Sequence, residues 1–255
     1  MIILLLIVVF IIVILLLGEN IKILYYTINK PKKNLFTPVP LKKRKIAIIT
    51  AENRNDEYIK YHDLNCKKYS RIHGYSYIRL NNCDPIESST YWCKIYKVKK
   101  FLESGNYDYV LWLDSDTIFT NFDTSIDYYI SKMGEPDIII SNDSNSYILN
   151  AGIFLIKNSN IGRSFINDCI NTIENNSNCI LDGKEQGMWA GACYEQGVIN
   201  ILLHEKYNKD YYFDEGDLIK NIINFDINKE YNLSLITHLP NSKNDNRNTF
   251  FKDYV

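Results

Sequence analysis

Residues 107–117 read Tyr-Asp-Tyr-Val-Leu-Trp-Leu-Asp-Ser-Asp-Thr. Residues 109–113 form an uninterrupted apolar run, which predicts a buried strand, and Asp114 and Asp116 follow it directly. Side chains two positions apart in an extended segment point the same way, so we expect both carboxylates on one side. Two such carboxylates can hold Mg²⁺ or Mn²⁺, which is then typically shared with substrate phosphate oxygens.

Strand and helix patterns alternate around this segment. Further strands are predicted at residues 45–50, 75–80, 137–141, 153–156 and 233–237, and helices at 56–73, 91–102, 161–173 and 198–204. The alternation predicts an α/β fold with a mostly parallel, Rossmann-like central sheet flanked by helices. Ligands of such sheets bind beyond the carboxyl ends of strands, and Asp114, Asp116 and His238 all lie just past predicted strand ends.

The N-terminal segment differs in character from the rest of the chain. Residues 1–17 are apolar throughout, and as a helix they would span about 26 Å, slightly less than a hydrocarbon core. We expect an uncleaved signal-anchor, with a cleaved signal peptide as the alternative. Residues 18–44 contain lysines and prolines and predict a stem, and residues 45–255 form the expected catalytic domain.

The distribution of net charge along the chain argues against some classes of function. Residues 1–44 carry a net charge of +6 and residues 45–255 carry −7. An acidic body argues against a nucleic-acid-binding protein, and it would need a metal ion to handle a phosphorylated substrate. The six cysteines include no C-x-x-C pair, which argues against a zinc site and leaves disulfides open.

The membrane orientation is ambiguous from sequence. The basic residues follow the anchor, which by the positive-inside rule favours a cytosolic body. Three glycosylation sequons, at Asn142, Asn175 and Asn232, are compatible with a lumenal body. We expect a single-pass protein of an endomembrane such as the ER or Golgi, with its body in the lumen.

Four sequence motifs, in this order along the chain, resemble those of a known enzyme family. Residues 107–117 resemble the D-x-D segment of nucleotide-sugar glycosyltransferases of GT-A fold, and residues 150–158 (Asn-Ala-Gly-Ile-Phe-Leu-Ile-Lys-Asn) resemble the acceptor-side strand of these enzymes. Residues 66–80 and Trp92-Cys-Lys94 fit the preceding strand and a W-x-K element. The pattern is similar to the galactosyl, mannosyl and xylosyl transferase family, glycosyltransferase family 34, over residues 45–240.

The resemblance implies a metal site. In that family the two aspartates bind Mn²⁺, or Mg²⁺ in its place, and the residue between them approaches the ribose, so these roles fall to Asp114, Asp116 and Ser115. A histidine near the C-terminus completes the metal shell, and His238 fits by its position after a strand. Family members often place a glycine soon after this histidine, whereas residues 239–242 here read Leu-Pro-Asn-Ser.

The donor nucleotide is expected to contact the end of the first predicted strand and the predicted helix at residues 91–102. Lys94 is a candidate for binding the diphosphate, and its alternative is an ordinary exposed lysine. Thr50 and Ala51 resemble the edge of the nucleotide-base pocket. Arg54 could reach a phosphate or pair with Asp56.

The sugar side is expected to involve a glutamine. The family has an acidic residue followed by glutamine at the start of an apolar helix, and two copies compete here, Glu185-Gln-Gly187 and Glu195-Gln-Gly197. Only the second leads into an apolar segment, so Glu195 and Gln196 are preferred. Asn150 and Gly152 would face the donor or acceptor sugar, and the alternative is a bulge in a buried strand.

These observations predict a metal-dependent glycosyltransferase. It would move a hexose or pentose from a UDP- or GDP-sugar to a glycan, glycoprotein or glycolipid acceptor, with retention of configuration as in the family. An inverting enzyme would need a carboxylate base, and Glu195 could serve. A catalytically inactive sugar- or nucleotide-binding protein of the same fold is the alternative. Residues 241–248 predict either a loop closing over the donor or a disordered tail.

Overall fold

The computed structural model describes residues 42–81, 90–143, 148–182 and 184–255. The predicted anchor and nearly all of the predicted stem lie outside these residues. Within the described residues, no helix combines the length and the apolar character needed to cross a membrane. Arg44, expected in the stem, is buried and pairs with Asp127 at 3.3 Å and Glu135 at 2.7 Å. The folded body therefore includes Arg44.

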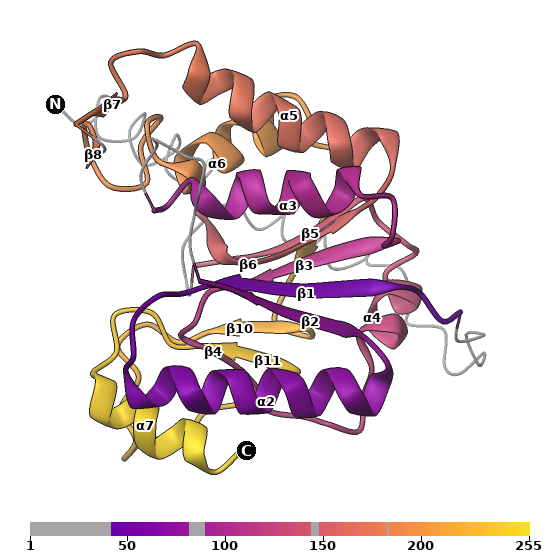
Figure 1. Cartoon of the computed structure of the whole chain (residues 1–255), viewed down its shortest axis with the longest axis vertical. Coiled ribbons are helices and arrows are strands. Elements are labelled where there is room, and N and C mark those ends of the chain that lie inside the picture. Colours follow the sequence, from indigo (N-terminus) through magenta and orange to yellow (C-terminus); the bar gives the residue numbers. More distant parts are fainter. Residues whose placement is uncertain (1–41, 82–89, 144–147, 183) are drawn as a thin grey trace, which may run out of the picture. The chain divides into compact units, whose positions relative to one another are not determined.

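A six-stranded sheet forms the centre of this body, in the order β2-β1-β3-β6-β5-β9 (Figure 1). Its strands are β1 (Ile46–Ala51), β2 (Ser76–Leu80), β3 (Tyr109–Leu113), β5 (Ile138–Asn142), β6 (Leu149–Lys157) and β9 (Tyr211–Asp214). β6 is antiparallel to both neighbours, whereas the other neighbouring pairs are parallel. The α/β class is confirmed, and the sheet is mixed because β6 returns beside β5 and inserts between β5 and β3.

Two smaller sheets accompany the central one. β10 (Ile219–Asn221), β11 (Ile236–His238) and β4 (Thr117–Phe119) form a three-stranded sheet in that order. β11 is antiparallel to β4, with His238 opposite Thr117. β7 (Ile180–Leu181) pairs with β8 (Lys184–Glu185). The β4–β11 pairing brings the C-terminal part of the chain to the aspartates.

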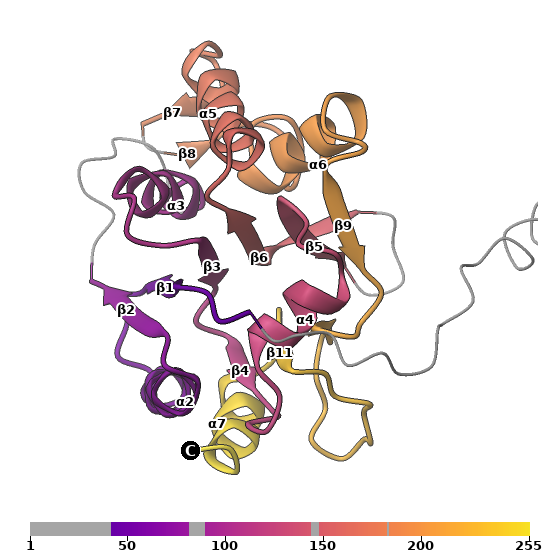
Figure 2. The same cartoon turned by 90° about the vertical axis from the view of Figure 1, so that its right-hand side faces the viewer.

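Helices cover both faces of the central sheet (Figures 1 and 2). They are α2 (Glu57–His73), α3 (Cys93–Glu103), α4 (Ile126–Lys132), α5 (Asn160–Glu174), α6 (Glu195–Glu205) and α7 (Asn244–Lys252). α3, α5 and α6 pack on one face, and their apolar side chains share a core with that face of β1, β3, β5 and β6. α2 lies on the other side, against β4 and α7.

Most predicted elements are confirmed within a few residues. α2 ends as expected at Gly74, which adopts the left-handed conformation (φ +71°). The predicted strand at 233–237 is shorter and later, since only Ile236–His238 pairs. Neither alternative for residues 241–248 is correct, because α7 begins at Asn244. Its Phe251 is completely buried and packs edge-on against Tyr58 of α2. This packing anchors α7, whose polar sequence resembles a loop.

Candidate active site

The two aspartates lie where β3 meets the first half of β6. The backbone N–H of Asp114 donates to the carbonyl of Gly152 at 2.8 Å, so β6 lies beside the D-x-D motif. Ligand atoms of Asp114, Asp116 and His238 lie within 4.8 Å of one another. The antiparallel β4–β11 pairing thus brings His238 to the two aspartates, from which it is far away in sequence.

His238 is held in one orientation. Its Nδ1 lies 2.8 Å from Oδ1 of Asn221, and the amide nitrogen of Asn221 donates to Ser141 and to the carbonyl of Asn142. The Asn221 oxygen must therefore accept a hydrogen bond from Nδ1–H of His238. Nε2 of His238 then faces Asp116, with its nitrogen 3.0 Å from Oδ1.

Arg247 of α7 also reaches Asp116, and the sequence provided no sign of it. Its guanidinium is buried, with Nη2 3.0 Å from Oδ2 of Asp116 and 2.8 Å from the Leu239 carbonyl, to which it donates. Burial alone would raise the pKa of Asp116, but His238 and Arg247 together lower this pKa far below its ordinary value. Asp116 therefore remains ionised.

Lys94 is buried and paired, so the reading as an ordinary exposed lysine is wrong. Its Nζ lies 3.2 Å from Asp114, 3.1 Å from Oε1 of Glu195 and 3.1 Å from the Ala151 carbonyl. Burial opposes the charge, yet Asp114 and Glu195 raise the pKa of Lys94 above its ordinary value. Trp92 donates to the Cys193 carbonyl at 3.0 Å, so both ends of the W-x-K element have partners.

Glu195 and Gln196 begin α6 and are both almost fully buried. Burial raises the pKa of Glu195, although Lys94 opposes the shift. Oε1 of Gln196 accepts from the Ala151 N–H at 3.1 Å, which orients the amide, and the buried Nε2 has no hydrogen-bond partner among the described residues. A buried amide donor without a partner is costly, and such a group is suited to a ligand acceptor.

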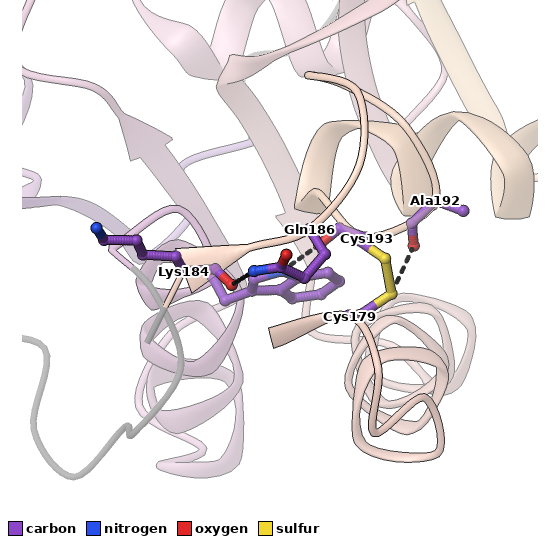
Figure 3. The surroundings of a disulfide bond; sticks show 6 residues. Cys179, Lys184, Gln186, Ala192 and Cys193 are labelled. Carbon is purple, nitrogen blue, oxygen red and sulfur yellow. Dashed lines mark hydrogen bonds between the residues drawn. A yellow bond between two sulfur atoms is a disulfide. The ribbon is translucent and has the colours of Figure 1, made fainter. Parts of the chain in front are cut away.

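The competing glutamine lies elsewhere. The Gln186 side chain turns back to donate from Nε2 to the Lys184 carbonyl at 3.0 Å, beside the disulfide between Cys179 and Cys193 (Figure 3). Gln186 is outside the lining of the cavity that contains Gln196.

Two cavities adjoin at the aspartates. The first, of about 760 Å³, is lined by Asn150, Gly152, Glu195, Gln196 and His238, among other residues. The second, of about 650 Å³, is lined by residues that include Ala51, Glu52 and Ser115. Asp114, Asp116 and Lys94 line both. A ligand with two parts could therefore occupy both cavities across the aspartates.

Only some of the residues predicted to contact the nucleotide line the second cavity. Ala51 and Ser115 line it, but Thr50 is completely buried and lies outside the lining of both cavities. Glu52, which follows the end of β1, lines the second cavity instead.

Glu52 also determines the place of Arg54. Its carboxylate accepts from Ser115 at 2.6 Å and from Nε of Arg54 at 2.9 Å, so Arg54 pairs with Glu52 rather than with Asp56. Burial would raise the pKa of Glu52, but the hydrogen bonds from Arg54 and Ser115 lower it to about 2.

In the first cavity, Asn150 and Gly152 both line the wall. Oδ1 of Asn150 accepts from the Gly152 N–H at 2.8 Å. Asn241 also lines this cavity, and its φ is +56°, a conformation that glycine prefers and asparagine tolerates. Asn241 thus adopts, three residues after His238, the conformation for which the missing glycine would be suited.

The chain is similar in sequence to one protein family and to one curated protein. Residues 42–135 match the model of the galactosyl transferase GMA12/MNN10 family. An Arabidopsis thaliana protein named "Putative glycosyltransferase 7" is 32% identical over 97 residues, which are 35% of this chain and 21% of that protein. The match therefore spans about a fifth of the length of that relative.

Among solved structures, a glycosyltransferase involved in the glycosylation of the major capsid of PBCV-1 has a TM-score of 0.59 at 16% identity, covering 82% of this chain and 99% of that one. The galactosyltransferase LgtC, solved with donor and acceptor sugar analogues, has a TM-score of 0.45 at 15% identity, covering 76% and 87%. The family match includes Asp114 and Asp116, and the first of these structures shares the fold. Together the findings confirm the resemblance to the family over residues 42–135 and show that this chain shares the fold of a solved glycosyltransferase.

Proposed function

We propose that the protein is a metal-dependent glycosyltransferase that transfers a hexose or pentose from a UDP- or GDP-sugar to a glycan or glycoconjugate. The observation that carries this proposal is the convergence of Asp114, Asp116 and His238 within 4.8 Å, beside a buried amide donor on Gln196. Two carboxylates and an imidazole suit Mn²⁺, with Mg²⁺ as a harder alternative.

The orientation of His238 is compatible with a cation at this place. Because Nδ1 donates to Asn221, Nε2 is the ring nitrogen that faces the Asp116 carboxylate, 3.0 Å from its Oδ1. Two acceptors at this separation need either a proton or a metal ion between them. Asn221 is the kind of outer partner that orients a metal-binding histidine.

When bound, the metal ion would neutralise the diphosphate of the donor and promote its departure. The chain itself supplies Lys94 and Arg247, both of which contact the metal-site aspartates and can bind phosphate oxygens. The second cavity suits the nucleoside, and the first suits the donor sugar. Nε2 of Gln196 would donate to an oxygen of that sugar.

We infer that the reaction retains configuration. Glu195 is 4% exposed and forms an ion pair with Lys94, which suits it poorly to act as the base that an inverting reaction needs. Instead, the acceptor oxygen would bond to the sugar carbon as the carbon–phosphate-oxygen bond breaks, and the acceptor proton would pass to a leaving phosphate oxygen. The absence of a glycine after His238 would favour an inactive binding protein, but Asn241 lines the cavity with a positive φ of the kind that glycine prefers, so this absence is weaker evidence against an enzyme.

We also propose that residues 1–17 anchor the protein in an endomembrane with its body in the lumen. The disulfide between Cys179 and Cys193 supports an oxidising compartment, and the sequon residues Asn175 and Asn232 are exposed. Protein made in eukaryotic cells should therefore lose mass on treatment with an N-glycosidase. An unchanged mass, together with reduced thiols at both cysteines, would contradict a lumenal body.

Replacing Gly152 with alanine should remove activity by displacing His238. A Cβ atom at Gly152 would lie 2.2 Å from Cε1 and 2.8 Å from Nε2 of His238, and displacement of a catalytic group by about 1 Å can cost about a hundredfold. The measurement is Mn²⁺-dependent release of UDP or GDP from a matching nucleotide-sugar. Gly162→Ala is the control, because the added Cβ would lie 2.1 Å from the Lys157 carbonyl oxygen and outside the active site. This variant should lose stability but keep its activity per folded molecule. Equal specific activity in both variants would contradict the assignment.

The two glutamines provide a second test. Gln196→Ala removes the buried amide donor and should lower turnover by about tenfold to a thousandfold, because the lost bond forms to the reacting sugar. Gln186→Ala removes the same amide group from a residue outside the cavity, so this variant should have the turnover of the unmodified protein. Loss of activity in Gln186→Ala alone would show that the other copy is the functional one.

A further inference from the structure

Three aromatic side chains line the first cavity. Tyr91 precedes α3, Tyr194 precedes α6, and Trp189 lies in the loop that follows β8. The rings of Tyr91 and Tyr194 meet edge to face at 5.5 Å between centroids. Trp189 is 55% exposed, which is unusual for a residue with so large an apolar surface.

These aromatic residues lie mostly away from the cavity assigned to the nucleoside. Trp189 and Tyr194 line only the first cavity, whereas Tyr91 lines both. Tyr194 is followed directly by Glu195 and Gln196, which we place beside the donor sugar. A molecule that approaches the donor sugar from this side would therefore contact the aromatic residues.

Covalent and backbone contacts hold the loop that carries Trp189. The disulfide joins Cys179 to Cys193, the residue before Tyr194. Within the loop, the Gly191 N–H donates to the Met188 carbonyl and the Tyr194 N–H donates to the Gly191 carbonyl. A Cβ at Gly197 would lie 1.9 Å from that Gly191 carbonyl, so α6 packs directly on the loop. A loop backbone held in this way is preorganised, which lowers the entropic cost of binding.

We propose that Trp189, with Tyr91 and Tyr194, forms the acceptor subsite, where the indole stacks on the apolar face of a pyranose. The inference rests on the proposed function and specifies its acceptor as a saccharide. A pyranose presents C–H groups on one face and hydroxyls at its rim, so an exposed indole can bind the face while the hydroxyls stay hydrated. The disulfide then acts as a positioning element for this subsite.

The chain contains its own reporter of this contact. Of the three tryptophans, Trp92 and Trp112 are buried and only Trp189 is exposed. Acrylamide should therefore quench mainly the fluorescence of Trp189. Cellohexaose, maltohexaose and chitohexaose, each titrated into the full chain, are the probes, and at least one should protect Trp189 saturably.

Calorimetric titration of the protective saccharide into variants tests the assignment of the ring. Trp189→Ala should weaken its binding by about tenfold or more, and Trp189→Phe should retain part of the affinity, because a smaller aromatic face remains. Met188→Ala is the matched control, since Met188 lies in the same loop, is 82% exposed and is outside the cavity lining. It should bind the saccharide as the unmodified protein does.

Two results would overturn the inference. One is the absence of protection by all three saccharides, and the other is equal saccharide affinity in Trp189→Ala and Met188→Ala. Nucleotide binding with Mn²⁺ is measured in parallel on the unmodified protein and reports on the proposed function alone. Saccharide binding without nucleotide binding would thus count against the transferase and leave the subsite intact.

Discussion

Burial of the Asp116 carboxylate is possible only because positive charge surrounds it. The side chain is 20% exposed, and its two oxygens contact His238 and Arg247 at 3.0 Å each. An isolated buried carboxylate would be strongly destabilising, so the partners must be in place when the site forms. These partners belong to β11 and α7, and the aspartate itself lies between β3 and β4. One charge thus joins the central sheet, the small sheet and the C-terminal helix.

The reversed strand β6 gives the site its second half. If β6 were parallel to β3, its first residues would lie at the opposite end of the sheet from Asp114. Because it is antiparallel, Leu113 pairs with Ile153, and Asn150 and Gly152 lie beside the aspartates. The N-terminus of α6 then contacts the same strand through the bond from Ala151 to Gln196. The cavity between these parts is accordingly lined by residues of seven separate chain segments.

Local patterns in the sequence predicted those parts of the site that lie on well-formed elements. The apolar run before Asp114 and the apolar segment after Gln196 have clear signals, and both residues lie in the cavity. Thr50 was misplaced because it is completely buried within β1, whereas Glu52 follows the end of that strand and lines the cavity. Arg247 and Asn221 could not be predicted, because each gains its role from a partner far away in sequence, and neither belongs to a motif. Arg247 lies moreover in a polar segment that resembles a loop.

The central claim is that Asp114, Asp116 and His238 hold a metal ion that binds the donor diphosphate. The most direct test is the melting temperature of the protein with UDP and with GDP, each with and without Mn²⁺. A ligand at a hundred times its dissociation constant stabilises the folded state by about 2.7 kcal/mol. One nucleotide should raise the melting temperature only when Mn²⁺ is present. The shift should vanish in Asp116→Asn and persist in Asp123→Asn, which changes an exposed aspartate outside the cavity lining. No shift with either nucleotide, or an equal shift in both variants, would contradict the central claim.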